Sequence, residues 1–154
     1  MFGADGQQER LKMACWISGF TDGEGSFVIS VIKNSTTRFG RQIFPEFVIT
    51  QGAKSLTSLE AIKNFFSCGS LILNKRYDNH SEDIYRYCVR SLPELKRVII
   101  PFFDEFPLKT FKQNDFVLFK KVVGMMDRKE HLNETGWNTI LRLAARTNRK
   151  KNRF

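Results

Sequence analysis

Apolar side chains recur every three to four residues in five stretches of the chain, which is the period of amphipathic helices. These stretches cover residues 8–22, 55–66, 112–126 and 134–146, and a fifth begins at Ser91 and ends before Pro107. Ser55 is expected to cap its helix, and Ser91 with Glu94 has the spacing of a capping box. The positions expected to face the interior are Leu11, Ala14, Cys15, Ser18, Leu56, Leu59, Ile62, Phe66, Leu95, Val98, Ile99, Phe102, Phe116, Val117, Phe119, Val122, Val123, Trp137, Ile140, Leu141 and Ala144.

In four further stretches, every second residue falls on the same face of an extended chain, and one of the two faces is apolar. This pattern predicts strands at residues 26–33, 44–51, 70–77 and 83–90. In the first, Phe27, Ile29 and Val31 alternate with Val28, Ser30 and Ile32. A basic turn around Gly40 joins the first two strands, and Asp78, Asn79 and His80 form the turn between the last two.

The order helix, two strands, helix, two strands, helices predicts an α+β fold of the αββαββα type. Two hairpins favour one four-stranded antiparallel sheet, with helices on its apolar face and the other face open. At 154 residues and 42% hydrophobic composition, we expect a single domain over residues 1–154. Residues 1–7 and 149–154 are expected to be flexible ends.

The positions opposite the predicted core are rich in side chains that can hydrogen-bond to base edges or phosphates. Arg38, Arg41 and Lys75 lie near the turns, where phosphate contacts are expected. An ordinary solvated sheet face has a similar alternation and is the alternative interpretation. The candidate nucleic-acid contacts are Val28, Ser30, Ile32, Asn34, Arg38, Arg41, Gln42, Phe44, Glu46, Val48, Ile72, Asn74, Arg76, Arg86, Cys88 and Arg90.

Charge supports the nucleic-acid interpretation, because 25 Lys and Arg against 16 Asp and Glu leave a net charge of +9. Plain solubility or attraction to an acidic membrane surface would also be compatible with this surplus. No apolar run approaches the length of a membrane span, and the N-terminus does not have the pattern of a secretory signal. Three widely spaced cysteines favour an intracellular location over a disulfide framework.

The stretch that carries chemistry is ACWISGFTDGEGSF at residues 14–27, a helix that ends in an acidic, glycine-rich turn. Gly19 and Gly23 are four residues apart and would let a second helix approach closely. Glu24 projects from the helix end, directly before the first strand. If two such helices pack about a two-fold axis, their Glu24 carboxylates come together and can bind a hard cation such as Mg²⁺ beside phosphates.

This segment resembles the motif of the LAGLIDADG homing endonucleases, with Ile17–Gly25 in the nine motif positions. The resemblance continues at residues 47–51 (FVITQ), at residues 107–123 (PLKTFKQNDFVLFKKVV) and at residues 131–148. It therefore extends over nearly the whole chain, and the motif combined with the 107–123 block is the specific part.

The resemblance implies that Glu24 and the Gly23 carbonyl bind metal, that Gln51 orients solvent, and that Lys112 stabilises charge on the phosphate. Lys109 is close enough in the alignment to compete with Lys112 for that role. Asp22 resembles a structural residue of the helix end. The implied metal is Mg²⁺, which Mn²⁺ or Ca²⁺ can replace for binding. Two departures from the family pattern are Ser18, in place of alanine, and Ser55, where some members have arginine.

One motif in this chain implies a homodimer, with an interface formed by Ser18, Gly19, Asp22 and Gly23. The expected function is an intron-encoded, site-specific endonuclease that hydrolyses one phosphodiester in each strand of a near-palindromic double-stranded DNA. No membrane or small-molecule substrate is implied, and the expected location is a prokaryotic cytoplasm, a mitochondrion or a chloroplast. Alternatives are an RNA maturase, a non-cleaving DNA-binding regulator, and a non-specific nucleic-acid binder that uses the basic tail Arg146–Arg153.

Overall fold

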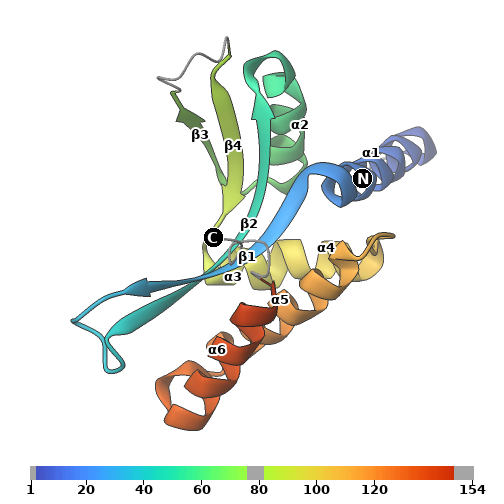
Figure 1. Cartoon of the computed structure of the whole chain (residues 1–154). Coiled ribbons are helices and arrows are strands. Elements are labelled where there is room, and N and C mark those ends of the chain that lie inside the picture. The colour runs from blue at the N-terminus through green and yellow to red at the C-terminus, as the bar shows by residue number, and fades with distance from the viewer. Residues whose placement is uncertain (1–2, 76–81, 148–154) are drawn as a thin grey trace.

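The computed structural model of the chain describes residues 3–75 and 82–147. Within these residues the predicted α+β order is confirmed (Figure 1). The predicted Arg76 and the turn at residues 78–80 lie outside the described part. The main elements are α1 (Ala4–Glu24), β1 (Gly25–Lys33), β2 (Arg41–Gly52), α2 (Leu56–Phe66), β3 (Ser70–Asn74), β4 (Ile84–Val89), α3 (Leu92–Glu94), α4 (Ile100–Glu105), α5 (Lys112–Asp127) and α6 (Glu134–Thr147).

The described strands form a four-stranded antiparallel sheet in the order β1-β2-β4-β3. β2 begins at Arg41, before the predicted residue 44, because its first residues pair with the end of β1. β4 pairs with β2 only from Phe47 onward. The outer half of the β1–β2 hairpin therefore projects beyond the rest of the sheet (Figure 1).

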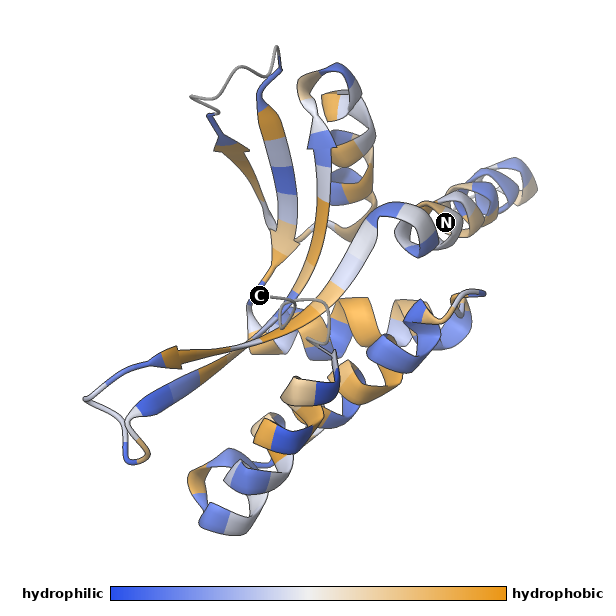
Figure 2. Cartoon of the chain, viewed as in Figure 1, coloured by the Kyte–Doolittle hydropathy of each residue, from blue (hydrophilic) through white to orange (hydrophobic). Residues whose placement is uncertain are grey.

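The core lies between the sheet and its helices, and Phe27 is at its centre. Its ring centroid lies 5.2 Å from that of Phe47 and 5.3 Å from those of Phe103, Phe116 and Phe119. Hydrophobic residues gather on the central strands and on α4 (Figure 2). Burial of each large apolar side chain contributes about 1.5–3 kcal/mol. This cluster therefore fixes Phe27, the third residue of β1, three residues after Glu24.

The buried stripe of α1 differs from the prediction. Ala14, Ile17, Ser18 and Thr21 are buried, while the predicted Leu11 and Cys15 are exposed. The N-terminal half of α1, which begins at Ala4 and not at residue 8, extends away from the sheet (Figure 1), so little of it is covered. Hydrophobic period predicts which side chains share a face, but not how far along the helix that face is covered.

Smaller predictions about the other helices were also wrong. Ser55 and Ser91 occupy N-cap positions, but neither makes a side-chain capping hydrogen bond. Residues 53–55 form a 3-10 turn that leads directly into α2, so Ser55 is not in the extended conformation that a capping side chain needs. The predicted third helix contains a π-helical segment, Leu95–Ile99, just before Pro101, whose missing N–H interrupts the regular hydrogen-bond pattern. Val117 on α5 is exposed because it lies one position outside the buried stripe.

The tip of the β1–β2 hairpin is anchored to the last helices. The Phe39 ring stacks on Trp137 of α6 with centroids 4.9 Å apart, and the Arg38 guanidinium donates a hydrogen bond to the Leu132 carbonyl. A hollow of about 390 Å³ lies beside this contact, and the buried Nδ1 of His131 has no hydrogen-bond partner among the described residues. The projecting hairpin is thus held by the helical layer as well as by its own strand pairing.

Candidate functional site

The last turns of α1 lead into β1 without an intervening loop. The backbone N–H of Gly25 donates to the Thr21 carbonyl, and a Cβ built on Gly25 would lie 2.6 Å from Thr21 Cγ2. Only glycine fits this close approach. Thr21 is fully buried, so the junction is fixed against the core. Glu24, one residue earlier, is left exposed at the junction of helix and sheet.

Gln51, near the end of β2, lies beside Glu24. Its amide Nε2 donates a hydrogen bond of 3.2 Å to Glu24 Oε2. The antiparallel pairing of Gly25 with Ile49 brings these two distant segments to the same edge. The structure therefore brings together the predicted metal-binding acid and the predicted solvent-orienting amide.

Lys112, the first residue of α5, reaches the same end of α1. Its Nζ donates hydrogen bonds of 2.9 Å to the carbonyl oxygens of Thr21 and Asp22. An ammonium group at this position is favoured because the C-terminus of a helix carries partial negative charge. Lys109 approaches through its backbone N–H, which donates to Asp22. Of the two competing lysines, the structure places the Lys112 ammonium group at the helix end.

Asp22 joins the helix end to the segment before α5. Its carboxylate accepts hydrogen bonds from the backbone N–H groups of Lys109 and Thr110 and from the Thr110 hydroxyl. Partial burial disfavours the ionised carboxylate, but these hydrogen bonds outweigh it and lower the Asp22 pKa below its ordinary value. These contacts agree with a structural role for Asp22 and hold Lys112 in place.

The predicted dimer-interface residues divide between two faces of α1. Ser18 is 8% exposed and donates to the Phe106 carbonyl, and Asp22 is bound to residues 109 and 110. Both therefore make contacts within their own chain, and their place in a dimer interface stays a prediction. Gly19 and Gly23 are exposed, and a Cβ at either would meet open space among the described residues. Packing within the chain therefore does not explain these two glycines.

The oxygen atoms at this helix end are suited to a hard cation. A carboxylate and backbone carbonyls are the ligands that Mg²⁺ and Ca²⁺ prefer, and the helix C-terminus attracts positive charge. In residues 3–75 and 82–147, no group of three or more His, Cys, Asp or Glu side chains gathers into a metal cluster. Glu24 and the Gly23 carbonyl thus have the chemistry of part of a coordination shell for such an ion.

The register places the predicted nucleic-acid residues of the strands on one face of the sheet, opposite Phe27 and Phe47. Ser26, Thr50, Ser70 and Ile84 share this face and were missed, although extending each alternation by one step would have found them. Val48 and Cys88 are on this face but are only 8% and 3% exposed, so they offer little surface for a direct contact, and that role stays a prediction. The predicted face residues that stay at least partly exposed are Val28, Ser30, Ile32, Gln42, Phe44, Glu46, Ile72, Asn74, Arg86 and Arg90.

Some of the predicted nucleic-acid contacts near the turns make hydrogen bonds within the chain. The Asn34 side chain donates to Gln42 and accepts from Thr36, which shapes the hairpin loop. Arg38 is bound to the Leu132 carbonyl, while Arg41 and Lys75 are exposed. The predicted phosphate contact of Arg38 therefore has an intramolecular competitor.

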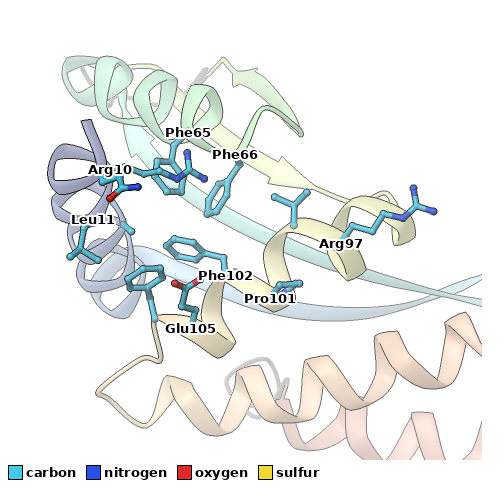
Figure 3. A pocket seen from close by; sticks show the side chains of 12 residues that line it. Arg10, Leu11, Phe65, Phe66, Arg97, Pro101, Phe102 and Glu105 are labelled. Atoms are coloured by element: carbon cyan, nitrogen blue, oxygen red, sulfur yellow. The ribbon is translucent and has the colours of Figure 1, made fainter. Parts of the chain in front are cut away.

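A separate hollow of about 440 Å³ lies between α1, α2 and α4 (Figure 3). Its wall contains Phe65, Phe66 and Phe102, and the Arg10 guanidinium lies 4.8 Å from the Phe65 ring centroid. None of its lining residues belongs to the Glu24, Gln51 and Lys112 group. In the described part of the chain, no helix has the length and apolar character needed to cross a membrane.

Comparison with known proteins gives the family. The sequence profile described as LAGLIDADG endonuclease matches residues 17–123. The chain is 32% identical over 128 residues to the "Probable intron-encoded endonuclease 2" of Neurospora crassa, covering 83% of this chain and 26% of that protein. It thus spans about a quarter of the length of the first curated relatives that it matches.

Solved structures similar to this chain are also homing endonucleases. I-TnaI, known from a crystal structure, is 38% identical in sequence to this chain with a TM-score of 0.77, and the match covers 88% of this chain and 87% of that one. I-SmaMI bound to cleaved DNA is also 38% identical with a TM-score of 0.80, covering 88% of this chain and 43% of that one. I-SmaMI has also been solved on an uncleaved DNA target in the presence of calcium ions. The chain belongs to the LAGLIDADG endonuclease family.

Proposed function

We propose that this chain is a homing endonuclease that cuts double-stranded DNA at a specific, near-palindromic site as a homodimer, with Mg²⁺ as its metal. The observation that carries this proposal is the convergence of Glu24, Gln51 and Lys112 at the end of α1. This group lies where the exposed glycine face of the helix meets the open face of the sheet. Relatives named as intron-encoded support an origin in a mobile intron. The site of action that we propose is inside the cell, in a prokaryotic cytoplasm or an organelle.

Each of the three side chains has a distinct task in phosphodiester hydrolysis. Glu24 and the Gly23 carbonyl would hold the divalent ion. When bound, such an ion polarises the phosphate and lowers the pKa of water. The Gln51 amide can hydrogen-bond to the attacking water while its Nε2 remains beside Glu24. The Lys112 ammonium group, fixed at the helix end, adds positive charge where negative charge develops on the phosphate.

Dimerisation follows from the open surface at Gly19 and Gly23. Small residues four positions apart let two helix backbones approach closely. A two-fold axis through this contact would bring the two Glu24 residues together, and would place one sheet along each half-site of the DNA. Trp16, which stacks on Phe20 and is 41% exposed, would be covered at the edge of that interface.

The test is cleavage of genomic DNA and of a randomised duplex library in Mg²⁺, with sequencing of the ends produced. Glu24→Gln should abolish cutting and leave binding to the selected site largely intact, because the change is nearly isosteric. Glu60→Gln, an exposed residue of α2, is the matched control and should cut like wild type.

The other outcomes separate the alternatives. Normal cutting by Glu24→Gln would refute the catalytic assignment. Specific binding without cutting by wild type would instead indicate a DNA-binding regulator. Promotion of group I intron splicing without DNA cleavage would indicate a maturase.

A further inference from the structure

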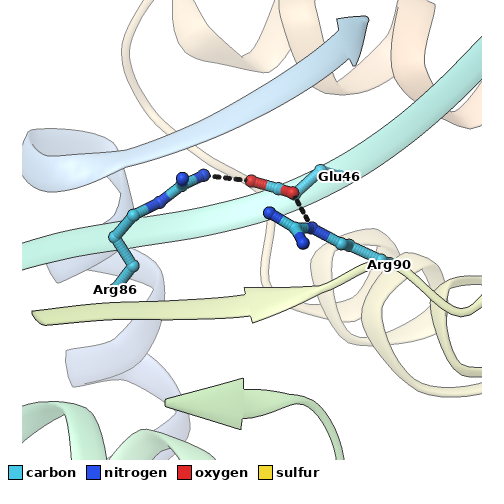
Figure 4. A network of polar contacts seen from close by, with 3 residues as sticks. All are labelled: Glu46, Arg86 and Arg90. Atoms are coloured by element: carbon cyan, nitrogen blue, oxygen red, sulfur yellow. Dashed lines mark hydrogen bonds and ion pairs between the residues drawn. The ribbon is translucent and has the colours of Figure 1, made fainter. Parts of the chain in front are cut away.

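Glu46 on β2 binds two arginines of the neighbouring strand at the same time (Figure 4). One carboxylate oxygen accepts a hydrogen bond from Arg86 Nη2, and the other accepts one from Arg90 Nε. The Glu46 side chain is 12% exposed, whereas Arg86 is 30% and Arg90 is 53% exposed. The acid is therefore largely covered, while both guanidinium groups remain accessible on the open face.

The strand register explains how one acid reaches both arginines. Val48 pairs with Cys88, Glu46 precedes Val48 by two residues, and Arg86 and Arg90 flank Cys88 by two residues on either side. The ion pair with Arg86 therefore runs diagonally across the Val48–Cys88 pair, while Arg90 follows Val89, the partner of Phe47, and so lies beside Glu46. Val48 and Cys88, which alternation places on the open face, lie between these charged residues and are buried, and burial raises the pKa of the Cys88 thiol.

A carboxylate on a DNA-binding face would ordinarily oppose binding, because phosphates repel it. Here two arginine charges outnumber the one negative charge, so the cluster remains cationic. Both Glu46 oxygens already accept hydrogen bonds from arginine, which competes with the direct contact that an acid can make to a cytosine amino group. A role through the arginines is therefore better supported than direct base contact by Glu46.

We propose that Glu46 is a positioning residue that sets DNA specificity by orienting Arg86 and Arg90 together toward the base edges. This inference rests on the proposed DNA-cutting function. Arginine recognises guanine through two parallel N–H groups, so its plane must be held in one orientation. Without the acid, each flexible cation can turn to the nearest phosphate, which binds every sequence alike. Glu46 thus lowers the affinity for unrelated DNA and raises discrimination.

The experiment compares wild type with Glu46→Gln. Each protein selects duplexes from a randomised library and is then titrated with its selected duplex and with one mixed-sequence duplex. Glu46→Gln should bind the mixed-sequence duplex several-fold more tightly, with a salt slope steeper by about 0.9 per added phosphate contact. The affinity ratio between the selected and mixed-sequence duplexes should fall roughly tenfold. Glu60→Gln makes the same charge change on exposed α2 and should keep the wild-type ratio.

A second variant tests the inference without removing the acid. Arg86→Lys keeps the charge but replaces the planar group with a compact ammonium. It should relax preference at the same base pairs as Glu46→Gln, without tighter binding to mixed-sequence DNA. Glu46→Asp keeps the charge on a side chain one methylene shorter, and it takes the place of Glu46→Gln in both comparisons if circular dichroism shows that Glu46→Gln does not fold.

The outcomes distinguish the two proposals. A wild-type chain that selects no site would refute the proposed function and this inference with it. A wild-type chain that discriminates, beside a folded Glu46→Gln that discriminates equally well, would refute the inference alone. Relaxation by Arg86→Lys at unrelated base pairs would also overturn it.

Discussion

The Lys112 ammonium lies 2.9 Å from the carbonyl oxygen of Thr21 and ties the first turn of α5 to the end of α1. The carbonyl of Asp22 accepts a second hydrogen bond from the same nitrogen. These two hydrogen bonds fix the Lys112 ammonium group against the last turn of α1, which carries Glu24. The contact joins two segments that are about 90 residues apart in the sequence.

Lys112→Met should slow cleavage about 10²- to 10³-fold, because one fixed charge-stabilising donor is lost. Binding to the selected site should change only a few-fold. Lys109→Met, three residues earlier, is the matched control and should retain most activity. Single-turnover cleavage rates measure both effects. If Lys109→Met cleaves much more slowly than Lys112→Met, the catalytic lysine is Lys109.

Gly19→Gln should weaken the dimer. Among the described residues the new side chain meets open space, and replacing a helical glycine stabilises the helix itself by up to about 1 kcal/mol. Between two packed helices the added side chain has no room, and such overpacking costs about 1–3 kcal/mol, which corresponds to a roughly 5- to 150-fold weaker dimer.

Sedimentation equilibrium measures that dissociation constant, and Thr57→Gln on exposed α2 is the control. If wild type is monomeric both alone and on its target, the helix-to-helix interface is wrong. If Gly19→Gln dimerises as tightly as wild type, the interface lies elsewhere on the chain.

Asp22→Asn should lower the free energy of unfolding by about 1–2 kcal/mol at pH 7, since hydrogen bonds to an ionised group are stronger than those to an amide. The folded pKa of Asp22 is lowered, so its ionisation stabilises the folded chain above the unfolded pKa of about 3.9. This contribution is lost as the pH falls through the folded value.

The difference between wild type and Asp22→Asn should therefore shrink from about pH 4 downward. Urea unfolding at several pH values measures it. The exposed Asp83→Asn should show a much smaller difference at pH 7. A difference for Asp22→Asn that is constant down to pH 2 would show that the charge of Asp22 does not contribute.

The sequence by itself determined the order of elements, the alternation of each strand and the motif at residues 17–25. These depend on local period and on residue type, so the faces of β1 and β4 could be predicted before any contact was known. Glu24, Gln51 and Lys112 could be selected because they match a family pattern. Their relation in space was not contained in any local window.

Tertiary structure decided what covers each face. Ser18 proved to be buried and bound to Phe106, while Gly19, its neighbour, stayed open. Val48 and Cys88 are buried on the open face, where Glu46 binds the arginines that lie two residues before and two residues after Cys88. Such outcomes depend on side chains that are distant in sequence and meet only after the sheet forms. Periodicity therefore identifies which residues share a face, whereas the partners packed on that face determine which of them remain accessible.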